Sequence, residues 1–179
     1  YARSYLAHDI QYFSFLRPLV DLQISRLLSR FPAQLQVIRS CNANRKHDSW
    51  CGRCPKCAFV YLCFFPFLER DVIHAIFGQD LFGCPEALGH IRALLDIDSN
   101  KPFECVGTVR ECEAAIMLAA QKYRLRGDRI PQAMQAMLDI VLQRSNTKID
   151  LSAVLNFWSN EHALPDEYAV LLNNSLAHD

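Results

Sequence analysis

The sequence predicts a mainly helical fold with a little β-structure (α+β), built around a loop that four cysteines hold together. Apolar residues recur at helical spacing along most of the chain, and Pro, Gly and capping residues separate the helical stretches. Five of the eight cysteines fall within residues 40–63. Because 51% of the 179 residues are apolar and 21% are charged, the chain can bury a core and is not expected to be disordered.

Charge and hydropathy narrow the range of partners. The formal net charge is zero, so the chain as a whole lacks the basic excess that is typical of a nucleic-acid-binding protein. Its longest apolar run, residues 58–68, is too short to cross a bilayer and is expected to be buried core. We therefore expect neither a nucleic acid nor a membrane as a partner.

Start and stop residues place the individual elements. Thr108 and Glu111 form a capping box and Gly127 suits a left-handed end, so a helix is expected over residues 109–126. Residues 36–40 are short and partly β-branched, and they are expected to form a strand. The other helices are expected at residues 18–30 (with Pro18 in the first turn), 55–65, 71–77, 84–97, 130–144, a short stretch capped by Asp150, and 165–176.

A soft boundary near residue 146 divides the chain into two expected domains, residues 1–145 and 146–179. The second is expected to be an acidic helical extension, because no Lys or Arg follows Lys148. A charge bias of this kind is typical of a solvated helix surface, and a docking face for a basic partner is the alternative.

The most specific pattern is C-x9-C-x2-C-x2-C, formed by Cys41, Cys51, Cys54 and Cys57. A C-x2-C pair with Gly or Pro in its turn directs both sulfurs into one space, and zinc prefers four such ligands in a tetrahedron. The two pairs overlap at their shared cysteine, so three ligands come from one short segment and the fourth returns from upstream. His47 lies inside the loop and is a substitute fourth ligand.

Other interpretations of these cysteines remain open. Disulfides need an oxidising compartment, and a thioredoxin-like redox pair accounts for only one C-x2-C. An iron–sulfur cluster could use the same ligands. Free buried thiols suit Cys63, Cys84 and Cys112 better than they suit the polar loop at residues 41–57.

Several cations surround this loop. They offset the net negative charge that four thiolates leave around Zn²⁺, and this explanation is plainer than a nucleic-acid site. Trp50 has few aromatic neighbours there, so a base-stacking platform is poorly supported. The cations are Arg39, Arg45, Lys46, Arg53 and Lys56.

The stretch "KPFECVGT" at residues 101–108 places an acid and a thiol just before a predicted helix start. Free N–H groups and the helix dipole there would stabilise an anion and lower the pKa of a thiol. Glu104 and Cys105 are therefore candidates for acid/base catalysis, and Gly107 would let an anionic group approach the backbone. The alternative is a buried thiol beside a solvated carboxylate.

Three stretches resemble known enzymes: "RPLVDLQISRLL" at residues 17–28, "RSCN…WCGRCPKCAFVYLC…PFL" and "KPFECVGT". The cysteine loop and the Pro-Leu turn before it are similar to those of PP-loop ATP pyrophosphatases of the 7-cyano-7-deazaguanine synthase type. The longer combination resembles the UDP-N-acetylmuramoyl-L-alanyl-L-glutamate epimerases (the MurL family) more specifically. The resemblance covers roughly residues 10–125.

The resemblance implies the C-terminal part of a PP-loop-type α/β enzyme in the bacterial cytoplasm. That enzyme would use ATP and Mg²⁺ to invert the terminal L-Glu of a UDP-muramoyl dipeptide through an acyl-adenylate, and it would carry structural Zn²⁺. The Ser-Gly-Gly-x-Asp-Ser type loop of PP-loop enzymes is absent here. We therefore expect the nucleotide-binding part to lie N-terminal to this chain, and the isolated fragment to be inactive.

Two alternatives stand beside this expectation. One is a zinc-stabilised interaction module without chemistry of its own, with the acidic extension as its docking face. The other is a deazaguanine-synthase-like PP-loop ligase, or a related enzyme that acts on RNA, for which the basic residues around the cysteine loop are the independent support.

Overall fold

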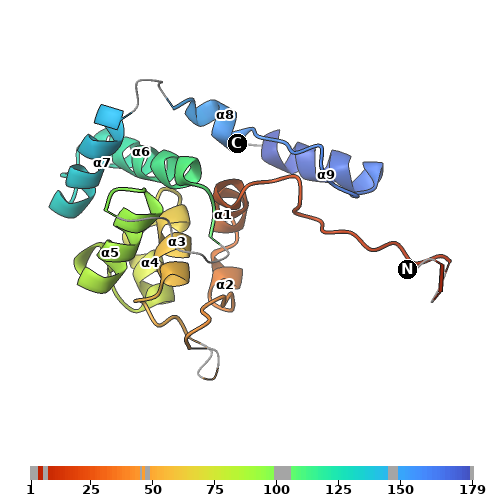
Figure 1. Cartoon of the computed structure of the whole chain (residues 1–179), viewed down its shortest axis with the longest axis horizontal. Helices are drawn as coiled ribbons and strands as arrows, with labels where there is room; N and C mark the ends of the chain where they lie inside the picture. The colour runs from red at the N-terminus through yellow and green to blue at the C-terminus, as the bar shows by residue number, and fades with distance from the viewer. Residues whose placement is uncertain are drawn as a thin grey trace.

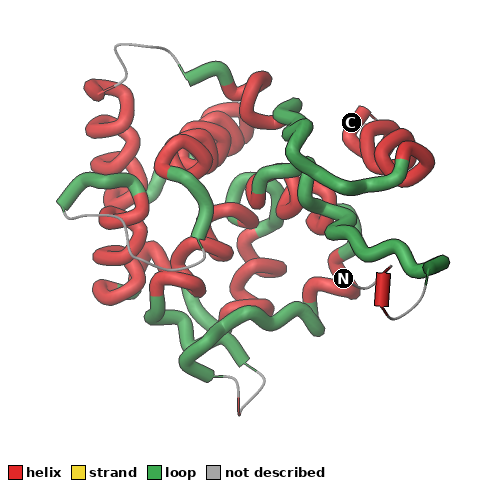
Figure 2. The backbone as a smooth tube through the Cα atoms, turned by 45° about the vertical axis from the view of Figure 1, so that its right-hand side comes forward, coloured by secondary structure: helices red, strands yellow, loops and turns green. Residues whose placement is uncertain are grey.

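The structure is a computed structural model that describes residues 4–5, 8–44, 46, 49–98, 106–144 and 149–177. Throughout these ranges the regular elements are helices, and none of the described residues forms a strand (Figure 2). The elements are α1 (Asp21–Ser29), α2 (Pro32–Leu35), α3 (Pro55–Phe64), α4 (Arg70–Phe77), the 3-10 turn η3 (Leu81–Gly83), α5 (Pro85–Leu94), α6 (Val109–Arg126), α7 (Gln132–Arg144), α8 (Leu151–Leu155) and α9 (Asp166–Ala177).

Helix α3 lies at the centre of the main body, packed against α1, α5 and α6 (Figure 1). Its sequence is apolar on every side, and a helix of that kind is stable only when it is buried all round. Seven of its ten residues are buried, among them Tyr61, Leu62 and Phe64. The metal-ligand candidates at the start of α3 are therefore attached to the most firmly packed element of the fold.

A second, smaller apolar cluster lies outside the main core. It joins Leu19, in the segment before α1, to Leu164 and Leu172 near and on α9. Helix α9 extends away from the body beside the N-terminal segment (Figure 1), whereas α8 contributes Val154 to the main core. None of the helices in the described ranges combines the length and the apolar character needed to span a bilayer.

The predicted mainly helical class is confirmed, but the predicted strand at residues 36–40 is wrong. A strand needs a partner for its backbone hydrogen bonds. The N–H of Val37 instead donates to the carbonyl of Gln34 at 3.1 Å, which prolongs the turn after α2. The domain boundary near residue 146 stays a prediction.

The first helix begins later than expected. Pro18 lies outside α1, because the N–H of Val20 donates to Oε1 of Gln23 at 2.9 Å and marks the start of the helix. Gln23 is buried, and its amide also donates to the carbonyls of Leu155 and Phe157 at 3.0 and 2.9 Å. One side chain thus defines the start of α1 and ties α1 to the end of α8.

Candidate metal centre and neighbouring site

The structure brings the four predicted thiols together. Their Sγ atoms all lie within 4.8 Å of one another, and we call them the thiol cluster: Cys41, Cys51, Cys54 and Cys57. The separations are 3.4 Å for Cys54–Cys57, 3.6 Å for Cys51–Cys57 and 4.0 Å for Cys41–Cys54. Four sulfurs placed about 2.3 Å from a central Zn²⁺ would stand about 3.8 Å apart, so these spacings fit a single tetrahedral ion.

These distances also separate the alternatives. A disulfide joins two sulfurs at about 2.05 Å, far shorter than the 3.4 Å seen here. The seven described cysteines are all free thiols. A cage of several irons and sulfides needs more widely spaced thiolates than this cluster offers. The thiol cluster could therefore hold one metal ion.

Local backbone geometry shapes the cluster. Gly52 has a φ of +69°, and a Cβ at this position would lie 2.1 Å from Nε2 of Gln79, so glycine suits the turn that separates the second and third thiols. Cys54 then caps α3, with Pro55 in the first turn, and its Sγ accepts the N–H of Cys57 at 3.4 Å. The helix start and the ligand set are therefore built from the same residues.

The electrostatics of the cluster favour a bound cation. Burial raises the pKa of the Cys54 thiol and, more strongly, that of Cys57. Burial also acts to raise the pKa of Cys41, but hydrogen bonds from Cys51, Cys57 and the Asn44 backbone lower it to about 7. Without a cation the four thiols cannot all ionise, and a divalent ion supplies the missing positive charge.

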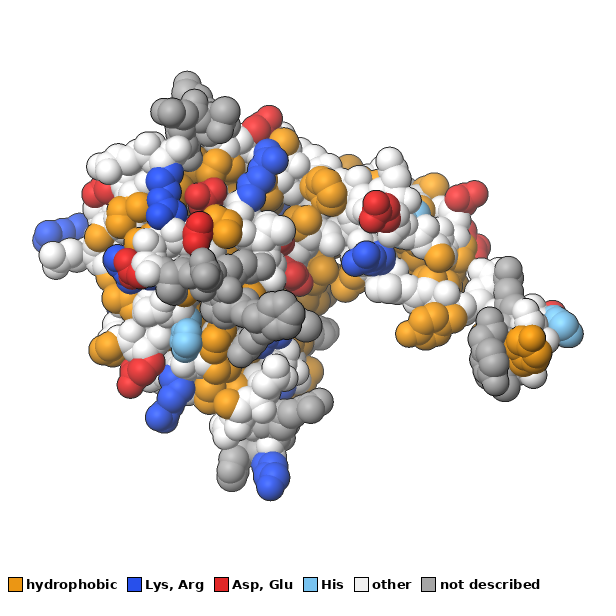
Figure 3. Space-filling model, in the orientation of Figure 1, with side chains coloured by type: hydrophobic (Ala, Val, Ile, Leu, Met, Phe, Trp, Pro, Cys, Tyr) orange, Lys and Arg blue, Asp and Glu red, His pale blue; other side chains and the backbone are white. Residues whose placement is uncertain are grey.

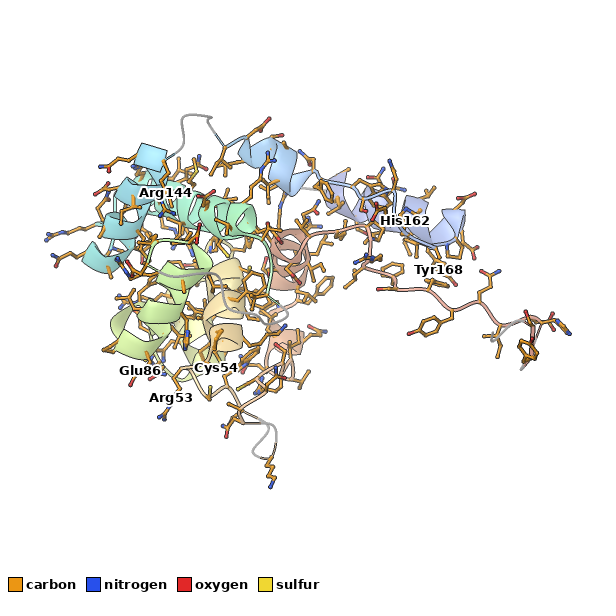
Figure 4. All side chains as sticks on the ribbon, viewed as in Figure 1. Arg53, Cys54, Glu86, Arg144, His162 and Tyr168 are labelled. Atoms are coloured by element: carbon orange, nitrogen blue, oxygen red, sulfur yellow. The ribbon has the colours of Figure 1, made fainter. Side chains whose placement is uncertain are left out.

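Charged residues flank the cluster at one end of the body. Arg53, next to Cys54 in the chain, and Glu86 are labelled at this end of the body in Figure 4. Glu86 also accepts a hydrogen bond from the thiol of Cys84 at 3.3 Å. Cys84 is only half-buried, so the expectation of a buried thiol fails there, whereas Cys63 and Cys112 are fully buried in the main core.

Trp50 is a core residue. Its ring lies 4.9 Å from that of Phe77, centroid to centroid, and the side chain is buried. Among the described residues its Nε1 finds no hydrogen-bond acceptor. A buried indole offers no surface for a nucleobase, which agrees with the sequence-based expectation.

The predicted acid/base pair, Glu104 and Cys105, and the substitute ligand His47 lie outside the described residues. The structure resumes at Val106, and Gly107 packs against the ring of Phe59: a Cβ there would lie 2.6 Å from Cζ. Gly107 therefore serves a close side-chain approach, and its expected role as a backbone approach point for a ligand stays a prediction.

Asp21 and Glu111 form a pair of interacting carboxyl groups near this segment, which we call the carboxylate pair and which the sequence did not predict. The buried Glu111 accepts the N–H of Thr108 at 2.7 Å and that of Leu22 at 3.4 Å, so it ties the start of α6 to the start of α1. Partial burial raises the pKa of Asp21, and Glu111 raises it further, whereas Lys56 lowers it. Glu111 had a local signal, the capping box, but nothing in the sequence pairs two helix starts that lie so far apart in the chain.

A cavity of 310 Å³ opens beside this carboxylate pair. Its wall combines apolar side chains with Glu111 and Arg110, and α8 closes one side through Val154. The thiol cluster, the carboxylate pair and this cavity all adjoin the starts of α1, α3 or α6.

Fold and site together define a helical domain with a four-cysteine loop at the start of its central helix. Loops of this kind are typical of metal-binding proteins. The chain belongs to the family described as the MurL C-terminal domain, whose family model matches residues 37–149. No solved structure showed a significant match to the chain.

Three curated relatives are all named UDP-N-acetyl-alpha-D-muramoyl-L-alanyl-L-glutamate epimerase. The chain is 40% identical to the Salinispora tropica protein over 80% of its own length, 36% identical to that of a Micromonospora species over 90%, and 32% identical to that of Xanthomonas oryzae pv. oryzae over 92%. It spans only 32%, 36% and 37% of these relatives, respectively. The chain therefore corresponds to about a third of such an enzyme.

Proposed function

We propose that this chain is the C-terminal part of an ATP-dependent epimerase that inverts the terminal L-Glu of UDP-MurNAc-L-Ala-L-Glu. The similarity to three epimerases of that name, over most of this chain, carries the proposal. The nucleotide-binding part of the enzyme would be its intramolecular partner, with Mg²⁺ accompanying ATP.

Activation by ATP has a chemical reason. The α-proton of a free amino-acid carboxylate is very weakly acidic, because its removal would place a carbanion beside a full negative charge. Transfer of AMP to the carboxylate, with release of pyrophosphate, removes that charge. An ordinary side chain can then take the proton from one face, and a second can return a proton to the other. Hydrolysis of the acyl-adenylate frees the D-glutamyl product.

We assign the proton-transfer roles to Glu104 and Cys105. In the sequence they directly precede the described segment that leads into α6, and Thr108 and Glu111 at that helix start line the cavity of 310 Å³. The test uses the full-length enzyme carrying Glu104→Gln or Cys105→Ala. In deuterated solvent, each variant should form the α-deuterated D-epimer at least about a hundredfold more slowly, because inversion needs both groups, while ATP–pyrophosphate exchange persists.

The chain offers a matched control for this experiment. Glu86 and Cys84 are another close acid–thiol pair, and Glu86→Gln with Cys84→Ala should leave deuterium incorporation unchanged. Wild-type rates of formation of the α-deuterated D-epimer in both the Glu104 and the Cys105 variants would remove the assignment. If a polypeptide without residues 1–179 still epimerised, the chain would be an interaction module; salt-sensitive RNA binding would favour an RNA-acting enzyme.

We further propose that the thiol cluster holds a structural Zn²⁺. Four protein ligands close the coordination sphere, which is typical of a structural site. The bound ion would cross-link the cysteine loop to the start of α3.

Elemental analysis of the purified protein tests this assignment. It should show about one zinc per chain in the wild type and in Cys84→Ser, whose thiol lies outside the cluster. Cys51→Ser should lose most of the metal. Equal metal content in all three proteins would exclude the cluster as the site, and iron in place of zinc would correct the identity of the ion.

A further inference from the structure

A second cavity, of 330 Å³, lies at the opposite end of α6 from the carboxylate pair. Its wall is formed by the end of α3, the start of α4, the end of α6 and the turn that follows α6. Four cations line it against the single carboxylate of Asp128, and we call it the basic pocket: Arg70, Lys122, Arg126 and Arg129. Its volume is at the lower end of the range of about 300–1,000 Å³ that is typical of small-molecule sites.

The partial negative charge at helix C-termini explains the positions of only two of these four cations. Arg126 lies in the last turn of α6, and Lys122 donates to the carbonyls of Phe65 and Leu68 at the end of α3. Both positions suit a positive charge, because helix C-termini carry partial negative charge. These two side chains would therefore be expected even without a ligand.

Arg70 and Arg129 do not fit that explanation. Arg70 is the first residue of α4, where the helix dipole disfavours a cation. Arg129 lies in the turn after α6, is exposed, and makes no hydrogen bond or ion pair with another described residue. Their shared feature is the basic pocket, onto which both side chains converge from different elements.

The pocket retains donors for an anion. Arg70 contacts Asp80 through one nitrogen at 3.2 Å, with 74% of its side chain exposed, and Arg126 pairs with Glu69 at the surface. A guanidinium has five N–H donors, so each arginine keeps several for a second partner. Exposed ion pairs are weak, and an entering phosphate can compete with them.

Two aromatic rings and a half-buried lysine also line the pocket. The rings of Phe65 and Tyr123 are stacked with an interplanar angle of 16° and centroids 6.2 Å apart. Lys122 lies over the Phe65 ring, with Nζ 5.8 Å from its centroid, and burial lowers the pKa of its ammonium group. A charge held away from water interacts strongly with an anion placed beside it.

We propose that the basic pocket binds a diphosphate group and that this diphosphate is the one in the UDP moiety of the muramoyl substrate. Arginines that converge from several directions match the many acceptor oxygens of a diphosphate, and Tyr123 offers a ring beside them. The assignment to UDP rests on the proposed function; the preference for a diphosphate rests on the pocket. Lys122 lies fourteen residues along α6 from Thr108, or about 21 Å, so the pocket is remote from the start of α6.

The test uses the full-length epimerase with Arg129→Ala, Arg70→Ala and the double variant. Arg124→Ala, which removes an exposed arginine in the last turn of α6 that does not line the pocket, is the matched control. Each pocket variant should raise the KM for the UDP-muramoyl dipeptide about tenfold with kcat unchanged, and should weaken inhibition by UDP to the same extent. The control should match the wild type.

Equilibrium titration with UDP, pyrophosphate and ATP separates the outcomes. Weaker UDP binding by the double variant supports the pocket even if the enzyme proves not to epimerise. Weaker binding of ATP or pyrophosphate, with UDP unaffected, would overturn the assignment to the UDP-linked substrate. Unchanged binding of all three ligands by a double variant that unfolds at the wild-type temperature would overturn the diphosphate site itself.

Discussion

At the scale of single residues, the close approach of two helices can leave no room for a side chain between them. Gly107 illustrates this, because its missing side chain admits both the ring of Phe59 from α3 and the carboxylate of Glu111 from α6. Phe59 is 2% exposed and cannot move aside without disturbing the main core. Gly107, the residue before the N-cap of α6, is therefore fixed by packing in addition to its place in the sequence motif.

Gly107→Ala should destabilise the fold. The added Cβ would lie 2.6 Å from Cζ of Phe59 and 2.8 Å from Oε2 of Glu111, and overpacking of this kind costs about 1–3 kcal/mol. Urea unfolding followed by circular dichroism measures the change. Gly89→Ala is the control, because nothing lies within 4 Å of its Cβ position in α5, and it should be neutral or stabilising by about 0.5–1 kcal/mol. Equal stability of the two variants would show that the Phe59 contact yields easily.

At the scale of elements, α6 joins the carboxylate pair at its start to the basic pocket at its end. Its capping box is complete: Thr108 accepts the N–H of Glu111 at 3.2 Å, and Glu111 accepts the N–H of Thr108 at 2.7 Å. Gly127 ends the helix in the left-handed conformation. Because Glu111 also bonds the start of α1, a weaker cap would loosen the carboxylate pair as well as one helix.

Thr108→Ala should lower the free energy of unfolding by about 1 kcal/mol, since it removes the side-chain acceptor for the N–H of Glu111. Thr108→Ser keeps the hydroxyl and should cost much less. Thermal unfolding of both variants measures the difference. Identical losses in the two would mean that the methyl group of the threonine matters more than its hydroxyl.

How far the sequence predicts the fold depends on how local each signal is. The bounds of α6 follow from the capping box at its start and the glycine that directly follows its last residue, so the expected range 109–126 is confirmed. The strand at residues 36–40 depended on a partner that the sequence could not identify, and residues elsewhere in the described chain supply none. Local β-propensity alone was therefore misleading.

The same distinction holds for the candidate site. The thiol cluster comes from short spacings within one loop, and the sequence predicts all its members. The contact of Leu22 with Glu111 joins residues 89 positions apart, and the basic pocket takes its arginines from the start of α4, the end of α6 and the turn after α6. Such groupings depend on how the helices pack, which periodicity and capping residues do not specify.

At the scale of the whole molecule, the domain consists of one large core with a smaller cluster beside it. The thiol cluster lies at the start of α3, and α3 forms the centre of the large core. Figure 3 shows the rounded body and the narrower extension that leads away from it. If the thiol cluster holds the proposed Zn²⁺, loss of this ion should therefore affect the stability of the main body more than it affects α9.

Removal of the metal by a chelator should lower the melting temperature. A ligand present at about a hundredfold excess over its Kd contributes about 2.7 kcal/mol, which corresponds to about 5–10 °C for a domain of this size. Trp50 lies in the cysteine loop, so a Trp158→Phe variant, in which Trp50 is the remaining indole, should show a fluorescence change on chelation. Re-addition of Zn²⁺ should restore both signals. A melting temperature that does not respond to the chelator would show that the core is stable without the ion.

Cys54 is both a proposed metal ligand and the N-cap of α3, so metal binding and the start of this helix should depend on each other. Its Sγ accepts the N–H of Cys57 and its carbonyl accepts the N–H of Ala58, so two amides of the first turn of α3 are held by one proposed ligand. Metal capture and closure of this turn then become a single cooperative event. Hydrogen exchange at these two amides should accordingly report the occupancy of the metal site, residue by residue, in the intact enzyme.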